Sequence, residues 1–333
     1  MFGFLRFYLA LLVVVTHIST MLGHAGGFAV YSFYTLSGYL MTYIMNENYG
    51  YNFAGFKKYA LNRFLRIYPA YWAVCIVTLV SIYNLPSQFY EIHESLRFPS
   101  GWYEIVSNIS ILGLFPNSID GGTEQMARLV PAAWALHVEL IFYILIGLFL
   151  GKHRFLVVAW LILSVLYTIV AIKYKLPRYA PFYAASLPFS LGAFLYHYRG
   201  TLLAFKPDSI LLTQLLLVFY VVYAATAGLI PITTSVYPFY FNIVLTAVLI
   251  LLLSDTRTDI RWIRNLDRFF GDLSYPIYLS HWLVASLVGI YFGLELSLSL
   301  FIITIPFLLL FSIIIKMLID DPVEKVRRKI APR

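Results

Sequence analysis

The sequence predicts an all-α, polytopic integral membrane protein, and three observations lead to that class. Hydrophobic residues make up 61% of the 333 residues, charged residues make up only 12%, and the mean hydropathy is +0.79. Apolar runs close to the ~20 residues that a helix needs to cross a bilayer recur from one end of the chain to the other. A soluble domain cannot bury so much apolar surface, whereas helices satisfy their own backbone polar groups inside lipid.

Ten apolar segments are expected to form transmembrane helices. They cover approximately residues 4–23, 27–46, 67–84, 132–150, 155–172, 182–198, 209–227, 237–254, 273–292 and 296–318. The segment 104–116 is too short and too polar for a span, so we expect it to be re-entrant or interfacial. The first segment is followed by further spans and lacks a clear small-residue cleavage site, so it is interpreted as a retained helix rather than a signal peptide.

The distribution of lysine and arginine predicts the orientation. With both termini cytoplasmic, 19 of the 24 basic residues lie on the cytoplasmic side, as the positive-inside rule requires. The other five are Arg97, Arg128, Lys173, Lys175 and Arg178. The net charge of +8 is explained by this placement, and no nucleic-acid partner is expected. We predict one transmembrane domain over residues 1–333, with an external loop at 85–131 and a short basic cytoplasmic tail at 319–333.

The first span carries two ionisable residues on one face. Arg6 and His17 are eleven positions apart, which at 100° per residue is about 20° past three full turns, and about 16 Å along the helix axis. Ionisable groups are costly inside a bilayer and usually mark a functional path. The alternative is that Arg6 only anchors the helix at the membrane surface and that His17 is a hydrogen-bonded packing residue.

A second basic pair begins the third span, in the block RFLRIYPAYW. Arg63 and Arg66 are three positions apart and therefore neighbours on one helix face. Two adjacent guanidinium groups suit a phosphate-rich ligand, because each can bind phosphate oxygens with two hydrogen bonds. Anchoring at the cytoplasmic surface is the alternative.

The fourth span, which opens with the block WALHVELIFY at Trp134, contains a carboxylate. Glu139 is expected at about the same depth as His17, counted from the external surface, so the two side chains could meet. His137 lies about 200° from Glu139 around the helix and is expected to face elsewhere, in a structural role.

Polar residues also mark the second and ninth spans. Ser274, Tyr278 and His281 form one stripe on the ninth span, and Tyr275 lies with Ser274 nearer the cytoplasm. Hydrogen bonding between helices is the alternative reading of this stripe. In the second span, Ser37 and Gly38 allow either close helix packing or the close approach of a ligand.

No metal site and no nucleotide-binding loop is expected. The chain has a single cysteine, Cys75, which is interpreted as a small core residue. The spacings CxxC and HExxH are absent from the sequence, as are GxGxxG and Walker-type loops.

Taken in order, these blocks resemble the acyltransferase-3 family of bacterial integral-membrane O-acyltransferases, which modify cell-surface glycans. Six parts carry the resemblance: the Arg6–x10–His17 pair, FYTLSGYL, RFLRIYPAYW, NISILGLFP, WALHVELIFY and SYPIYLSH. Ala135 and His137 depart from the family pattern, where serines are common, so one polar neighbour of Glu139 is missing. Some family members carry a fused extracytoplasmic esterase-like domain, and none is expected here.

The resemblance implies an acyl-CoA donor, usually acetyl-CoA, a glycan or lipid-linked saccharide acceptor, and a place in the bacterial inner membrane. On this basis His17 and Glu139 are expected to be catalytic, with His17 as general base or nucleophile and Glu139 orienting it. The residues expected to bind the donor are Arg6, Arg63, Arg66, Ser37 and Tyr275. The residues expected to contact substrate or support the site are Trp134, Ser274, Tyr278 and His281.

Two other interpretations stay open at this point. One keeps the fold but changes the group or acceptor, as in succinylation of a glucan or acylation of a lipid or an antibiotic. The other is a transporter or flippase, since buried ionisable residues also form proton or substrate paths. The sequence shows no repeated half of the kind found in many transporters. It makes no prediction of oligomeric state.

Overall fold

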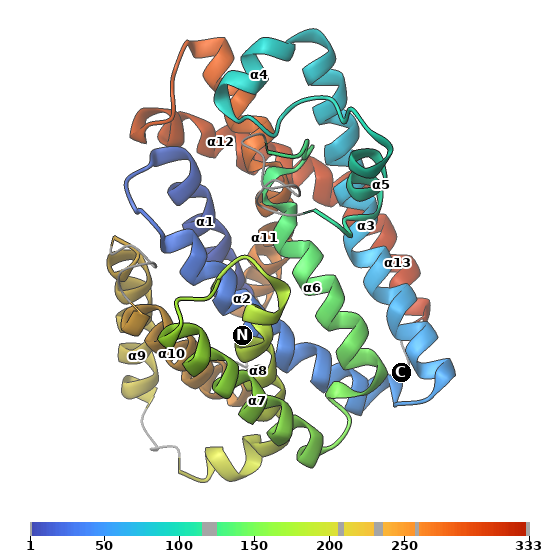
Figure 1. The fold of residues 1–333 in the computed structure, drawn as a ribbon, viewed down its shortest axis with the longest axis vertical. Helices are drawn as coiled ribbons and strands as arrows, with labels where there is room; N and C mark the ends of the chain where they lie inside the picture. Colours follow the sequence, from blue (N-terminus) through green and yellow to red (C-terminus); the bar gives the residue numbers. More distant parts are fainter. Residues whose placement is uncertain (1, 115–124, 206–209, 230–235, 257–259, 331–333) are drawn as a thin grey trace.

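The computed structural model of the protein describes residues 2–114, 125–205, 210–229, 236–256 and 260–330. Within these ranges the regular secondary structure is helical and includes no strand, which confirms the all-α prediction (Figure 1). Parts of the expected 85–131 loop and 319–333 tail, and residues 115–116 of the short polar segment, lie outside the described residues.

Each of the ten expected spans corresponds to a helix. These helices are α1 (Gly3–Ser19), α2 (Ala25–Ile44), α3 (Phe53–Asn84), α6 (Trp134–Leu145), α7 (Arg154–Lys173), α8 (Ser186–Leu203), α9 (Ile210–Ala227), α10 (Val236–Asp255), α11 (Arg261–Phe292) and α12 (Leu298–Ile315). Three shorter α-helices are α4 (Pro86–Ile92), α5 (Trp102–Ser110) and α13 (Asp321–Ile330). Short π-helices follow α2, α6 and α12 (Met45–Tyr49, Ile146–Leu150 and Lys316–Asp320), and short 3₁₀-helices precede α6 and α8 (Pro131–Ala133 and Phe182–Ala185).

Among the described helices, six segments are long and apolar enough to cross a membrane. They are Phe53–Asn84, Pro131–Leu150, Arg154–Lys173, Val236–Asp255, Arg261–Phe292 and Leu298–Ile330. A multi-pass membrane protein is thereby supported, while the number of helices that cross and the side on which the termini lie stay predictions.

Two helices begin much earlier than their apolar sequence indicates. Helix α3 starts at Phe53 rather than near 67, and α11 starts at Arg261 rather than near 273. Hydropathy fails here because the first turns of both helices are charged, although they continue the same helix. The start of α3 is fixed by Asn52, whose side chain accepts a hydrogen bond from the Gly55 N–H at 2.8 Å. Arg63 and Arg66 consequently lie well inside a helix rather than at its beginning.

Helix α2 lies at the centre of the bundle and packs against α1, α8 and α10. Its contact with α8 depends on two glycines. A Cβ atom on Gly38 would lie 2.3 Å from the carbonyl oxygen of Phe189, and one on Gly192 would lie 2.1 Å from that of Thr35. Small residues let helix backbones approach closely in membranes. Close packing is therefore the role of Gly38, while its neighbour Ser37 lies in the wall of a cavity.

The short polar segment does not cross the bundle. Helix α5 has nine residues, about 14 Å of helix, which is about half the thickness of the hydrocarbon core. Its last carbonyl groups, which a helix cannot satisfy internally, accept hydrogen bonds from side chains of α3. The donors and acceptors are Tyr71 to Asn108 at 2.7 Å, Trp72 to Ile109 at 2.8 Å and Tyr68 to Ser110 at 2.6 Å.

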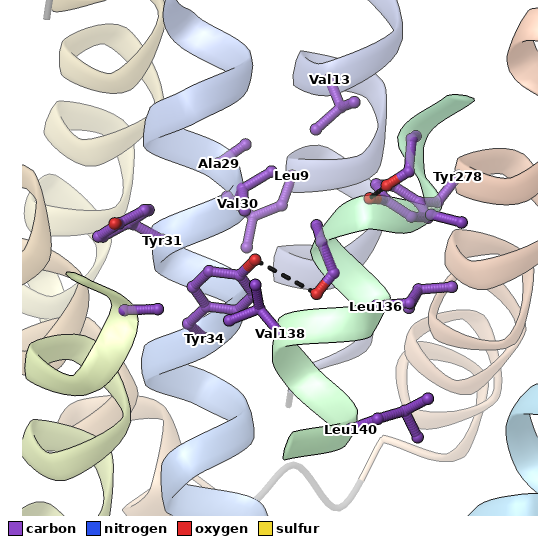
Figure 2. Close-up of a cluster of buried hydrophobic side chains, with 14 of the residues drawn as sticks. Leu9, Val13, Ala29, Val30, Tyr31, Tyr34, Leu136, Val138, Leu140 and Tyr278 are labelled. Carbon is purple, nitrogen blue, oxygen red and sulfur yellow. Dashed lines mark hydrogen bonds between the residues drawn. The ribbon is translucent and has the colours of Figure 1, made fainter. Parts of the chain in front are cut away.

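An apolar layer fills the middle of the bundle where α1, α2, α6 and α11 meet. Figure 2 shows Leu9 and Val13 of α1 facing the inner side chains of α2 and α6, and all of those labelled are buried. The polar tips within this layer are satisfied by backbone oxygens: Tyr34 donates to Ala135 at 3.2 Å (dashed in Figure 2) and Tyr278 donates to Ala132. On α1, Leu9 and Val13 lie between Arg6 and His17, so the layer separates two polar regions.

Candidate active site

The first polar region is a cavity of about 590 Å³ bounded by α1, α2, α3, α6, α11 and α13, which we call the arginine cavity. It brings together most of the residues that the sequence singled out. Those in its lining are Arg6, Ser37, Arg63, Arg66, Glu139, Ser274, Tyr275 and Tyr278. Trp134, His17 and His281 lie elsewhere. The residues expected to bind a donor therefore share one space, although they come from four helices.

Arg6 is placed by the anchoring of α1 against α11. The Phe4 N–H donates to the Asp267 carboxylate at 3.0 Å, where it satisfies one of the free N–H groups of the first helical turn. Gly3 lies so close to α11 that an added Cβ would be 1.7 Å from the Asp267 carbonyl oxygen. The start of α1 is thus fixed in position, and with it the guanidinium one turn further on.

The two α3 arginines have weak partners. Arg63 donates to the neighbouring Asn62 amide oxygen at 2.9 Å. Arg66 lies 3.9 Å from the Asp320 carboxylate and packs over the ring of Tyr275, 5.8 Å from its centre. The Tyr275 hydroxyl donates to the Ile67 carbonyl at 2.8 Å, so its ring, and not its hydroxyl, faces the arginines.

Helix α13 contributes charged residues that the sequence analysis did not assign to a site. It runs beside α3 (Figure 1), and Arg327 donates to the Asn62 oxygen at 3.0 Å and to Glu324 at 2.6 Å. The further charged residues in the lining are Arg268, Asp272, Asp320, Asp321 and Arg328. The sequence signal was the run of basic residues in the 319–333 tail, which was counted only toward the cytoplasmic placement of the C-terminus.

Glu139 accepts hydrogen bonds from the hydroxyl groups of Ser37 and Tyr143. Ser37 reaches it from α2, and Tyr143 lies one turn further along α6. The polar neighbour missing at Ala135, one turn earlier, is therefore replaced by donors from other positions. A buried carboxylate needs such donors, because an unpaired charge in an apolar interior is very costly.

The expected contact between Glu139 and His17 is wrong. Both side chains are described, and no hydrogen bond or ion pair joins them: Glu139 faces the arginine cavity, whereas His17 faces α11. Counting residues from a membrane surface predicts depth but not the direction in which a side chain points around its helix. The proposed orienting role of Glu139 toward His17 has no support in this geometry.

The second polar region is a cluster of rings formed by His17, His93, His281 and Trp282, which we call the histidine cluster. His17 Nδ1 lies 2.9 Å from His281 Nε2, and the two rings stack with centres 5.2 Å apart. Trp282 stacks on His17 at 5.5 Å, and His93 meets the Trp282 ring edge-on at 4.5 Å. The partner of His17 is therefore the imidazole of His281 on α11 and not a carboxylate.

His93 and Arg128 come from the segment between α3 and α6 and were not predicted. Burial, together with the nearby Arg128 and His17, lowers the pKa of His93 to about 3. Burial also lowers the pKa of Arg128, to about 10, which leaves it charged near neutral pH. His93 is therefore neutral beside a cation, an environment that opposes protonation of imidazoles. Its segment carries no hydrophobic periodicity from which its position could have been found.

His137, Trp134 and Ser274, the remaining residues singled out by the sequence, are each bonded to or packed against neighbouring residues of the protein. His137 Nδ1 accepts a hydrogen bond from the Gly113 N–H at 3.0 Å, which agrees with its expected structural role away from Glu139. Trp134 meets the ring of Tyr179 edge-on at 5.3 Å. The Ser274 hydroxyl donates to the Gly271 carbonyl at 2.7 Å. Within the part of the chain that the structure describes, no group of three or more His, Cys, Asp or Glu side chains is arranged to hold a metal ion.

These features define a helical membrane protein with a charged cavity and, inside the bundle, a pair of imidazoles of which His281 is buried and His17 partly buried. The model of the acyltransferase-3 family, described as an acyltransferase domain, matches residues 2–319. The chain therefore belongs to this family and is a multi-pass membrane acyltransferase, which confirms the resemblance seen in the six sequence blocks. Neither the comparison with curated proteins nor that with solved structures finds a match.

Proposed function

We propose that the protein transfers an acetyl group, or another acyl group, from acyl-CoA to a hydroxyl of a cell-surface or lipid-linked glycan in the bacterial inner membrane. The observation that carries this proposal is the arginine cavity. Its arginines lie on the side of the bundle that the distribution of basic residues predicts to be cytoplasmic, the side from which acyl-CoA would arrive.

The cavity suits a ligand that carries several phosphate groups. Its volume, about 590 Å³, is within the ~300–1,000 Å³ typical of small-molecule sites. Glu324 pairs with Arg327 and Arg328 at 2.6 and 3.2 Å. Neither Arg6 nor Arg63 forms an ion pair with a described residue. Two guanidinium groups thus stay available for phosphate oxygens, with Arg66 only loosely held.

The chemistry is assigned to His17. Its imidazole removes the proton of the acceptor hydroxyl as the hydroxyl oxygen attacks the thioester carbon. The carbon–sulfur bond then breaks, and the departing thiolate takes the proton from His17. A stepwise route is equally compatible: the imidazole displaces the thiolate to give acyl-His17, and the acceptor oxygen then displaces the imidazole while the proton of the hydroxyl passes to the thiolate.

The apolar layer must open for this transfer. The lining of the arginine cavity includes Val30, Leu136 and Tyr278 but stops short of His17. Leu9 and Val13 are buried on the stretch of α1 that lies between. The flexible thioester arm of an acyl-CoA would pass where these side chains now pack (Figure 2). Glu139, in turn, would balance Arg6 and Arg63 in the cavity wall and hold the Ser37 and Tyr143 hydroxyls in place.

A purified-protein assay tests the proposal. Protein in lipid nanodiscs is given acetyl-CoA with or without a glycan-lipid extract, and free thiol is measured. Thiol release that depends on the extract is expected. No binding of acetyl-CoA would contradict the donor, and release without any acyl-glycan product would contradict the acceptor.

Mass spectrometry of surface glycans from a deletion strain identifies the acceptor and the acyl group. Loss of an acetyl group from a sugar is expected. Loss of a succinyl group, or an acylated lipid or antibiotic in place of a glycan, would instead support the other acceptors considered above. Family membership already favours an enzyme over a transporter or flippase.

A further inference from the structure

A hydrogen bond to backbone oxygen determines which ring nitrogen of His281 carries a hydrogen. His281 Nδ1 is 2.7 Å from the carbonyl oxygen of Tyr278, one turn earlier on α11. A carbonyl oxygen can only accept a hydrogen bond, so Nδ1 of His281 must carry a hydrogen. This contact therefore fixes one of the two ring nitrogens of His281 as a donor.

The other nitrogen of His281 is then an acceptor. The ring is fully buried, at 0% exposure, and its hydrogen-bond and ring partners among the described residues are His17, Tyr278 and Trp282. None of these supplies a negative charge, and an imidazolium without one is costly in an apolar interior. His281 is accordingly neutral, with a lone pair on Nε2.

The proton on the neighbouring ring follows from this. His17 Nδ1 lies 2.9 Å from the lone pair of His281 Nε2, so His17 Nδ1 must be the donor. In a neutral imidazole the second nitrogen then has no hydrogen, which leaves the lone pair of His17 on Nε2. Histidine in water favours the opposite tautomer, with hydrogen on Nε2, so the arrangement is imposed by α11.

We propose that His281 is a positioning residue that selects the Nδ1–H tautomer of His17 and thereby makes Nε2 of His17 the reacting atom. The chain of bonds runs from the Tyr278 carbonyl through His281 to His17, and Trp282 stacking fixes the plane of the ring. The catalytic consequence rests on the proposed function, because both the base and the nucleophile routes need a lone pair on the nitrogen that faces the substrate.

This arrangement differs from a carboxylate–histidine pair in one respect. A carboxylate orients an imidazole and also stabilises the cation that forms on it, whereas a neutral imidazole bonded to a carbonyl mainly orients. Selection of the tautomer is therefore the part of the orienting role that this site retains without Glu139.

The tautomer can be measured directly in the full-length protein in nanodiscs. The ring nitrogens of its seven histidines are isotope-labelled, and the His17 signals are identified by their loss in His17→Asn. Wild-type protein is expected to show hydrogen on Nδ1 of His17. In His281→Leu the hydrogen should move to Nε2, whereas His281→Gln, whose side-chain oxygen can accept from His17, should keep it on Nδ1.

The activity of the same variants gives the second readout. His281→Leu should lower kcat by at least about 100-fold, the lower end of what a positioned general base contributes, with the KM for acetyl-CoA unchanged. His281→Gln should recover a large part of the loss. His153→Leu, at an exposed position before α7, is the matched control and should behave as wild type.

Three outcomes would overturn the inference: hydrogen on Nε2 of His17 in the wild type, an unchanged His17 tautomer in His281→Leu, or no recovery of kcat by His281→Gln. If His281→Leu does not fold, the spectra of the wild type and of His281→Gln still show whether Nδ1 of His17 carries the hydrogen. A wild type with the expected tautomer but no acyl transfer would instead contradict the proposed function. Failure of the tautomer inference and failure of the proposed function are therefore distinguishable.

Discussion

The arginine cavity and the histidine cluster share two helices, α1 and α11, yet they are built in opposite ways. The cavity holds full charges of both signs, loosely paired, in a space bounded partly by the terminal helix α13. The cluster is neutral: His281 and Trp282 are buried, His17 and His93 are partly buried, and His281 is bonded to a backbone carbonyl oxygen. The comparison teaches that two functions need different surroundings. An anion is bound by charged side chains that are free to leave their weak partners, whereas a proton is transferred by a ring that hydrogen bonds hold in one orientation.

The largest effect is expected from the cluster side. His17→Ala should lower acyl transfer by about 10²–10⁴-fold or more, the contribution of a general base, while the affinity for acetyl-CoA stays within twofold of wild type, because His17 lies outside the arginine cavity. Thiol release and calorimetric binding measure the two quantities. Near-wild-type transfer, in protein that inserts normally, would remove His17 from the chemistry.

The next largest effect is expected in the arginine cavity, where a substitution should weaken donor binding rather than slow the chemical step. Arg63→Ala removes a cavity guanidinium, and a charge-assisted hydrogen bond is worth about 1.5–3 kcal/mol, so the Kd for acetyl-CoA should rise about 10–100-fold. The rise should shrink at high salt, since phosphate contacts of this kind are screened. Lys57→Ala, on an exposed face of the same helix, is the control. An equal loss in both variants would mean that only general surface charge attracts the donor.

A smaller change, toward tighter donor binding, is expected when the weak ion pair between Arg66 and Asp320 is removed. Asp320→Asn frees Arg66 from a carboxylate 3.9 Å away, a contact worth about 0–1 kcal/mol at a partly exposed position, so the Kd for acetyl-CoA should fall by up to about fivefold. The change in Kd is read by titration against wild-type protein under identical salt. Weaker binding would show that Asp320 helps to form the site rather than competing with the ligand.

The last effect concerns stability and leaves activity unchanged; it lies in the segment that leads to Arg128, beside the histidine cluster. Burial alone would raise the pKa of Glu104, but backbone hydrogen bonds from Ala127 and Ser100 and the Arg97 charge lower it below its usual value. Glu104→Gln should therefore reduce stability by about 1–3 kcal/mol near pH 7, because it weakens several of these bonds. Donor affinity should not change.

The pH dependence of this variant checks its cause. Because the folded-state pKa of Glu104 is lowered, its contribution to stability is present above the unfolded value, about 4.3, and is lost as the pH falls through the folded value. The difference in melting temperature between wild type and Glu104→Gln should thus be largest near neutral pH and smallest in acid. A difference that does not depend on pH would point to lost packing instead.

Periodicity and composition were sufficient to predict the apolar part of each long helix, and ionisable residues in or beside apolar segments were sufficient to find Arg6, Arg63 and Arg66. The direction of side chains was not predictable in the same way, because Glu139 and His17 share no sequence pattern that sets the rotation of α6 against α1. Arg327 and His93 were missed because a charged tail and an irregular segment carry no signal of what they pack against. Tertiary packing decides both.

The apolar layer of Leu9 and Val13 also has an electrical consequence. These side chains are buried, so in a membrane they would form a barrier of low dielectric constant between the arginines and the imidazoles. Each elementary charge that crossed it would exchange about 2.3 kcal/mol with a potential of 100 mV. A neutral thioester arm carries no such charge, and a bundle closed around it would keep the ion gradients of the cell intact during every transfer.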